Sequence, residues 1–325
     1  MTLGGRVSST STIAAGLLLA LSACSGGGSP PAPNSAQPAA APTATPQPAP
    51  TPATTPAATP SAQVIFDGEF TGTTLDTSTW FSCYPWGSAG SCTNNQYGIA
   101  YPEEEQYRAS QLVVGDGTLQ LVAARTSVKS GFPWTSGMIT TGGPFVWPPQ
   151  PTFAYTYGYA EMRAQLPAGA GFWPAFWLVP ANGSWPPEID IMEWQGAQPQ
   201  TDFMTVHFSD AHAKNDSLGG TYDSPGLSSG FHTYGVDLEP NAITWYLDGA
   251  ARVRVTAAQF AARGATLPNL PMYVIVNLAV GGWVSGSNAQ TPSPAALVVQ
   301  YVRVWNRLPQ PLLATERLRS RALER

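Results

Sequence analysis

Short alternating runs of apolar residues, each bounded by turn residues, are the feature of this chain that most limits its fold. The runs cover residues 119–123, 243–247, 252–255, 272–280 and 298–305, and they follow the two-residue period of β-strands. Asp248-Gly249 separates two of them, and Asp-Gly in that place is a strong hairpin signal. Helical periodicity is scarce, with one short helix expected at about 257–263. The pattern predicts an all-β protein, either a sandwich or a jelly roll.

The run 272–280 shows how such a strand divides its side chains between two faces. One face carries Met272, Val274, Val276, Leu278 and Val280, and the other carries Tyr273, Ile275, Asn277 and Ala279. An Asn on a mostly apolar face costs free energy unless it finds a partner. Asn277 therefore either lines a ligand cleft or completes a hydrogen bond in the core, and the sequence leaves both open.

The composition divides the chain of 325 residues into three parts. No charged residue lies between Arg6 and Asp67, and all 11 Trp lie between Trp80 and Trp305. This predicts a leader, an uncharged tether and one aromatic-rich body. The formal net charge is −5, which disfavours nucleic acid as a partner because phosphate binding needs a basic surface.

The leader, residues 1–23, has one cation, Arg6, followed by an apolar run over 13–21. That run is too short to span a bilayer and is typical of a secretory signal. Leu21-Ser22-Ala23-Cys24 resembles the bacterial lipoprotein processing box, which implies cleavage before Cys24 and a lipid on its sulfur. The alternative is an ordinary secretory signal with an incidental cysteine. We expect an exported protein anchored to a bacterial membrane through Cys24, the outer membrane if there is one.

Residues 24–63 are rich in Pro, Ala and Thr and lack aromatic residues, so we expect an extended linker without a core. Two further cysteines, Cys83 and Cys92, follow it. Export to an oxidising compartment predicts a disulfide between them, with two free thiols as the alternative.

The segment 187–194 places three carboxylates, those of Glu188, Asp190 and Glu193, among apolar residues. Glu188 and Asp190 point to the same face of a strand because the period is two. Glu193 joins that face only if a β-bulge adds one residue. With the bulge, three acids line one surface.

Clustered acids repel one another, so their pKa values should separate. A glycosidase needs that separation, since one carboxylate must be ionised while another donates a proton to the leaving oxygen. Two alternatives remain from the residues alone, namely Ca²⁺ binding through the oxygens and a solvated strand face.

Tryptophans surround the acids, and aromatic faces can stack on the apolar faces of sugar rings. We expect Trp173, Trp185 and Trp194 to line a cleft and Trp177 to lie in the core. Core packing is the alternative for each of them.

The six residues 188–193 resemble the active-site signature of glycoside hydrolase family 16, in its bulge-containing, laminarinase-like branch. Other segments resemble that family in order, namely 64–70, 171–178, 231–237, 277–282 and 301–305. The resemblance covers residues 64–306, which we predict to be the catalytic domain, and leaves an Arg-rich tail at 307–325.

The resemblance implies a β-jelly-roll of two curved antiparallel sheets with a concave sugar-binding cleft, and retention of anomeric configuration. It implies that Glu188 is the nucleophile, Glu193 the general acid/base and Asp190 an assisting acid, with His207 near the acid/base. The predicted substrate-binding residues are Trp173, Trp185, Trp194, Asn277, Trp283, Glu104 and Gln106.

The sequence departs from the family pattern at three places. Met138 stands where members often have Arg, and Gln300 stands where many have an acid that helps to hold a structural Ca²⁺. Calcium is therefore doubtful despite Glu69, no other metal site is expected, and no cofactor is required. The stretch 142–153 is longer than the simplest members need, which indicates a loop at the cleft rim that alters specificity.

The expected function is that of a monomeric endo-glycosidase acting on a β-linked polysaccharide, with β-1,3-glucan favoured. One alternative is a transglycosylase or depolymerase that acts on the producer's own exopolysaccharide. Another is a non-catalytic carbohydrate-binding module, which the retention of all three acids disfavours.

Overall fold

A computed structural model describes residues 61–88, 91–94, 102–284, 286–310 and 312. The predicted leader, Cys24, most of the linker and most of the Arg-rich tail lie outside the described residues. None of the helices in the described part combines the length and apolar composition that a membrane crossing requires.

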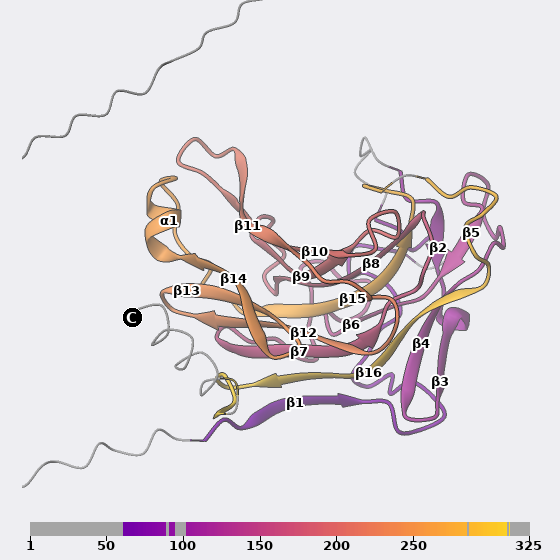
Figure 1. The fold of residues 1–325 in the computed structure, drawn as a ribbon, viewed down its shortest axis with the longest axis horizontal. Coiled ribbons are helices and arrows are strands. Elements are labelled where there is room, and N and C mark those ends of the chain that lie inside the picture. Colours follow the sequence, from indigo (N-terminus) through magenta and orange to yellow (C-terminus); the bar gives the residue numbers. More distant parts are fainter. Residues whose placement is uncertain (1–60, 89–90, 95–101, 285, 311, 313–325) are drawn as a thin grey trace, which may run out of the picture. The chain divides into compact units, whose positions relative to one another are not determined.

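Two antiparallel sheets make up the body (Figure 1). The larger sheet contains β14 (Ala250–Thr256), β13 (Ala242–Leu247), β12 (His232–Glu239), β7 (Gly158–Gln165), β16 (Ala295–Trp305), β4 (Thr118–Ala123) and β3 (Leu112–Gly115) in that order, with β1 (Val64–Glu69) also paired to β16. The smaller sheet contains β11 (Asn215–Asp223), β10 (Thr201–Ser209), β9 (Glu188–Trp194), β8 (Phe172–Pro180), β15 (Met272–Val280) and β6 (Met138–Thr140). A short parallel pair, β2 (Glu105–Tyr107) and β5 (Trp134–Ser136), and the helices η2 (Ala109–Gln111) and α1 (Ala257–Ala261) complete the elements.

The prediction of an all-β sandwich is confirmed, and so is the short helix that follows β14. The predicted hairpin joins β13 to β14. At its turn Asp248 and Gly249 have φ values of 51° and 68°, as the type I′ turns favoured in two-residue hairpins require.

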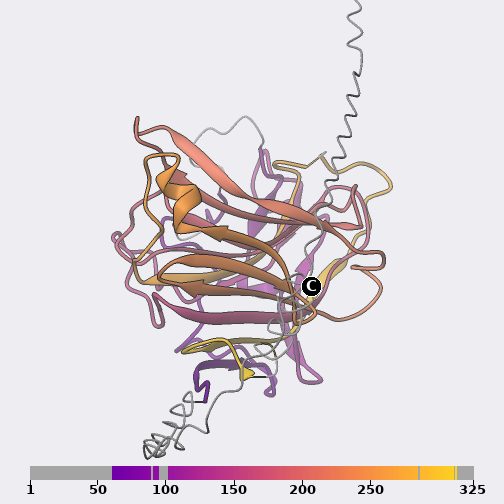
Figure 2. The ribbon, with the colours of Figure 1, turned by 60° about the vertical axis from the view of Figure 1, so that its left-hand side comes forward.

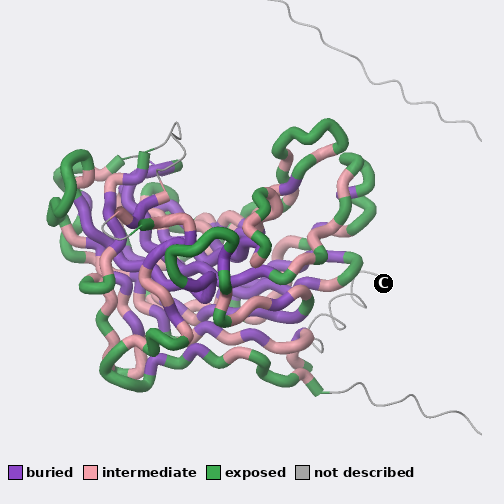
Figure 3. The backbone as a smooth tube through the Cα atoms, turned by 180° about the vertical axis from the view of Figure 1, so that it is seen from behind, coloured by how far each residue is buried: buried purple, intermediate pink, exposed green. Residues whose placement is uncertain are grey.

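The main core lies between the two sheets. Figure 2 shows the two sheets from a second side. In β15 the alternation is as predicted, because Val274, Val276 and Leu278 belong to this core. Tyr273 and Ile275 belong instead to a second apolar cluster. Exposed residues gather on the loops and the β11 hairpin, whereas the sheets are largely buried (Figure 3). The second face of the smaller sheet therefore carries its own apolar cluster, separate from the main core.

The second apolar cluster also contains Cys83, Cys92 and Trp177. Cys83 and Cys92 form a disulfide, which confirms that prediction. The disulfide closes a loop that brings Tyr84 and Trp86 against Trp177, with ring centroids 6.1 and 6.3 Å away.

Candidate active site

A β-bulge in β9 brings the three carboxylates to one face, as predicted. Asp190 lies opposite Trp177 of β8 while Glu193 lies opposite Ala175, so three steps along β9 match two along β8. The same shift occurs against β10. A bulge disturbs the ladder of backbone hydrogen bonds, and here Trp245 Nε1 donates to the Asp190 carbonyl from the other sheet, at 2.8 Å.

The bulge creates a shared acidic cavity of about 80 Å³. Its lining includes all three carboxylates of β9, and the other lining residues are Tyr84, Asn94, Glu103, Trp173, Ala175, Trp177 and Asn277. Acids and aromatic rings therefore face the same small space.

Burial in this cavity raises the pKa of each acid. Desolvation raises the pKa of Glu188 to about 8, with a further contribution from the charge of Asp190. Desolvation also raises the pKa of Asp190 to about 8. The pKa of Glu193 is raised well above its ordinary value by burial and then by the charges of Asp190 and Glu188. Because Glu193 experiences both neighbouring charges, it keeps its proton when Glu188 ionises.

Each of the two glutamates is held by a tryptophan. Trp185 Nε1 donates to Glu188 Oε2 at 3.0 Å, and Trp173 Nε1 donates to Glu193 Oε1 at 3.0 Å. The ring of Trp173 lies so close to Gly282 that a Cβ there would be 2.5 Å from it. Gly282 thus gives Trp173 room to reach the acid.

His207 lies on β10 directly opposite Glu188. Its Nε2 is 3.2 Å from Asp190 Oδ2. One ligand atom each from Glu188, Asp190 and His207 lie within 4.8 Å of one another. The three side chains therefore form one compact cluster, which brings the predicted His207 into the site.

Asn277 satisfies both interpretations that the sequence left open. It lines the acidic cavity, and its Oδ1 accepts a hydrogen bond from Trp177 Nε1 at 2.8 Å. Its Nδ2 donates to the hydroxyl of Tyr107 at 3.0 Å. The amide is therefore a fixed part of the cleft floor.

The prediction that Trp194 lines the cleft is wrong. Its side chain is completely buried in the core between the sheets. Trp194 directly follows Glu193 in a strand, so the two side chains point to opposite faces. Once the bulge turns Glu193 toward the cleft, Trp194 must enter the core.

Two further predicted substrate-binding residues, Gln106 and Glu104, do not line the acidic cavity. Gln106 is completely buried. Glu104 accepts hydrogen bonds from the Ser287 backbone N–H, at 2.9 Å, and from the Ser287 hydroxyl. It therefore orders the chain after β15. Trp283 is 39% exposed and contacts Trp173 edge-on, with centroids 5.9 Å apart, so its predicted contact with substrate stays a prediction.

Several residues that line the acidic cavity were not among the predicted site residues. Trp177 is buried in an apolar cluster, as predicted, and it also lines the acidic cavity. Glu103 is also buried and lines the acidic cavity. The run Glu103-Glu104-Glu105 carried a signal for this, because alternation places Glu103 and Glu105 on the face opposite Glu104.

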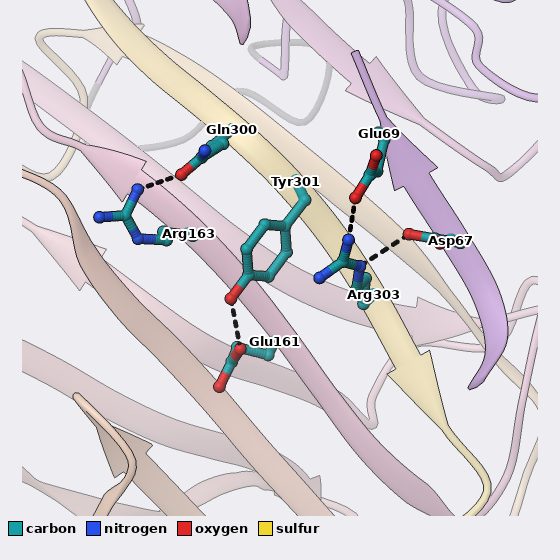
Figure 4. A network of polar contacts seen from close by, with 7 residues as sticks. All are labelled: Asp67, Glu69, Glu161, Arg163, Gln300, Tyr301 and Arg303. Carbon is teal, nitrogen blue, oxygen red and sulfur yellow. Dashed lines mark hydrogen bonds and ion pairs between the residues drawn. The ribbon is translucent and has the colours of Figure 1, made fainter. Parts of the chain in front are cut away.

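The position suspected of holding calcium is occupied by arginines (Figure 4). Arg303 pairs with Asp67, at 2.7 Å, and with Glu69. The side-chain oxygen of Gln300 accepts a hydrogen bond from Arg163. Guanidinium groups thus engage the two carboxylates and the Gln300 amide oxygen at this position.

Comparison with known proteins agrees with this geometry. Residues 94–303 match the model of the glycosyl hydrolases family 16. Endo-1,3-1,4-beta-glycanase ExsH of Rhizobium meliloti (strain 1021) is 33% identical over 243 residues, covering 73% of this chain and 48% of that protein. Glucan endo-1,3-beta-glucosidase A1 of Niallia circulans is 35% identical over 270 residues, covering 74% of this chain and 37% of that protein. This chain thus spans less than half the length of either relative.

Solved structures show the same fold. The catalytic domain of an endo-1,3-beta-glucanase (laminarinase) from Thermotoga petrophila RKU-1 has a TM-score of 0.64 and 28% identity, covering 77% of this chain and 98% of that one. The endo-beta-1,3-glucanase from Pyrococcus furiosus also has a TM-score of 0.64, with 32% identity and coverage of 76% and 95%. The two sheets are the jelly roll of these enzymes, and the chain belongs to glycoside hydrolase family 16.

Proposed function

We propose that this protein is a retaining endo-glycoside hydrolase whose substrate is a β-1,3-linked glucan. The observation that carries the proposal is the placement of Glu188 and Glu193 in one cavity, each held by a different tryptophan. Several similar proteins are named endo-1,3-beta-glucanases or laminarinases, which supports the choice of substrate.

In the first step an ionised Glu188 oxygen attacks the anomeric carbon, while Glu193 donates its proton to the glycosidic oxygen. The bond from carbon to that oxygen breaks and the acceptor chain leaves. The sugar is then bound covalently to Glu188. In the second step Glu193 takes a proton from water, the water oxygen attacks the same carbon, and Glu188 is released as a carboxylate. Two inversions give net retention.

Asp190 lies between the two glutamates on the strand, and its charge disfavours ionisation of both. Its Oδ2 lies 3.2 Å from His207 Nε2, so the two side chains restrict each other's position. We assign Asp190 and His207 as positioning residues for the two glutamates.

Product analysis tests the function directly. Full-length protein is incubated with laminarin, lichenan, agarose and carrageenan, and the anomeric protons are followed by NMR while product sizes are determined by mass. We expect oligosaccharides from laminarin that appear first as the β anomer. First appearance of the α anomer would contradict retention. Products longer than any hydrolysis fragment would indicate transglycosylation, and binding without cleavage would indicate a binding module.

Replacing Asp190 by Asn is expected to move the acid limb of the kcat/KM profile to lower pH. Asp190 raises the pKa of Glu188, so removing its charge lets Glu188 ionise in more acidic solution. The alkaline limb should move in the same direction, because Asp190 also raises the pKa of Glu193. The profile is measured with laminarin on both proteins. An unmoved acid limb would show that Asp190 does not control the ionisation of Glu188.

Removing divalent ions is expected to leave both stability and hydrolysis unchanged. Arg303 already pairs with Asp67 and Glu69, and the proposed reaction uses Glu188 and Glu193 without a metal ion. The thermal midpoint and the laminarin rate are measured after exhaustive EDTA dialysis and again after Ca²⁺ is returned. A thermal midpoint that rises by several degrees with Ca²⁺, or a laminarin rate that depends on Ca²⁺, would contradict this expectation.

A further inference from the structure

A second and larger cavity, of about 590 Å³, extends from Glu188 away from Glu193. Strand register gives its direction. Glu193 lies opposite Ala175 on β8, whereas the larger cavity is lined by Trp177, Val179 and Pro180 farther along that strand. Glu193 protonates the leaving oxygen, which belongs to the acceptor. The cavity on the Glu188 side therefore receives the donor part of the glucan chain.

Three separate loops build the walls of this cavity, and each contributes one tryptophan. The disulfide loop supplies Trp86, the long loop 142–153 supplies Trp147, and the loop before β9 supplies Trp185. With Trp177 in the floor, four indoles surround the space. Aromatic rings in such numbers bury large apolar areas of a ligand.

Trp86 and Trp147 are positioned by specific contacts. Trp86 stacks on Tyr84, with centroids 4.7 Å apart and planes at 9°. Trp147 lies against Gly183, where a Cβ would be 2.7 Å from the indole and where φ is +78°. A side chain at residue 183 would thus displace the ring. The contact with Gly183 thus holds Trp147, in the middle of the loop 142–153, in the wall of the cavity.

Trp147 and Trp185 are nevertheless each 55% exposed. Large exposed apolar side chains beside a cavity are typical of a binding surface rather than of core packing. Their free ring faces continue the cleft that begins at Glu188.

The rings do not form a flat platform. Trp86 and Trp147 are inclined at 76°, and Trp86 and Trp177 at 57°. A β-1,4-linked glucan is a flat ribbon whose ring faces lie in nearly one plane, and it suits parallel aromatic surfaces. A β-1,3 linkage turns each sugar relative to the last, so its chain can present successive faces to inclined rings.

We propose that Trp147, together with Trp86, binds a donor-side sugar beyond the one attacked by Glu188 and selects donor chains that are β-1,3-linked. This inference rests on the proposed function and deepens it, since it assigns the linkage preference to particular residues. It also gives the long loop 142–153 a role, which is to close the far end of the cleft around a turned chain.

The test uses full-length protein and the variant Trp147→Ala, with aryl β-glycosides whose donor chains have one to five glucose units. The aryl group occupies the acceptor side, so only donor contacts change along the series. In the native protein kcat/KM should rise as the donor lengthens. In the variant we expect no change with the shortest donor and a loss of about 10- to 100-fold once the donor reaches residue 147.

A second series places a β-1,4 linkage in the donor part. Native protein should prefer the all-β-1,3 donors, and Trp147→Ala should lose most of that preference. Phe145→Ala is the matched control, because Phe145 is 49% exposed on the same loop and does not line the cavity. Thermal midpoints of all three proteins verify that each is folded.

The outcomes separate the two proposals. A loss in Trp147→Ala that is equal for every donor length, or no loss at any length, would overturn the role of Trp147 while leaving the hydrolase assignment intact. Unchanged discrimination between linkages would overturn the selection of β-1,3 donors. Failure of the native protein to cleave any member of the series would overturn the proposed function, and the inference with it.

Discussion

Glu188→Ala is expected to lower kcat on laminarin by at least about 10⁴-fold, as loss of a covalent nucleophile does in other enzymes. The carboxylate that would attack the anomeric carbon is then missing, and the small space that it leaves is apolar on one side. The thermal midpoint should not fall, because Glu188 is a desolvated acid whose pKa is raised by burial. Steady-state rates and thermal unfolding of the same preparation measure both effects.

A small anion should restore part of this activity and reveal the role of Glu188. Azide can enter the space left by the carboxylate and attack the anomeric carbon, while Glu193 still protonates the leaving oxygen. The product would be the α-glycosyl azide, which is inverted relative to the β-linked substrate. Glu239→Gln is the control, since Glu239 is partly exposed and pairs with Arg254 on the larger sheet. Recovery of a β-glycosyl azide from Glu188→Ala would contradict its role as the nucleophile.

Glu193→Ala is expected to slow cleavage by an amount that depends on the leaving group. With a sugar as leaving group, loss of the proton donor should reduce the rate of the first step by about 10²- to 10⁴-fold. A dinitrophenyl glycoside needs no proton for departure, so its first step should be nearly unchanged. The glycosyl-enzyme on Glu188 should then accumulate, because no base activates water.

Pre-steady-state kinetics would show this accumulation as a burst of dinitrophenol, and mass spectrometry would show the modified protein. Azide should accelerate turnover of Glu193→Ala and give the β-glycosyl azide, since Glu188 still performs the first inversion. The opposite stereochemistry in the two alanine variants distinguishes nucleophile from acid/base. Equal losses for sugar and dinitrophenyl leaving groups would show that Glu193 does not act as the acid.

Local sequence determined the parts of the fold that depend on the pleat of a strand. The alternation in 272–280 placed Val276 and Asn277 on opposite faces, and the structure shows that these faces are the core and the cleft. The spacing of Glu188, Asp190 and Glu193 required a bulge if all three acids were to share a face, and the bulge is present. These inferences succeed because successive side chains in a strand point to opposite faces whatever surrounds them.

The same alternation of side chains predicts a core position for Trp194, for which our prediction of a cleft position was wrong. A bulge that turns Glu193 toward the cleft turns its neighbour into the core, and Trp194 is completely buried. The composition of the segment favoured a cleft tryptophan, whereas the geometry of the strand excluded it. Residue type is thus a weaker guide than position along a strand.

Only the tertiary structure decided which distant segments meet at the acids. Glu103 joins the acidic cavity from a segment more than eighty residues before β9. Trp86, Trp147 and Trp185 converge on one cavity from three loops. Periodicity carries no information about such meetings, because they depend on sheet order and on the paths of loops over the sheet. The sequence by itself predicted an all-β sandwich or jelly roll with three acids that share a strand face if the strand is bulged. The bulge itself and what those acids face were decided by the pairing of strands and by packing between distant segments.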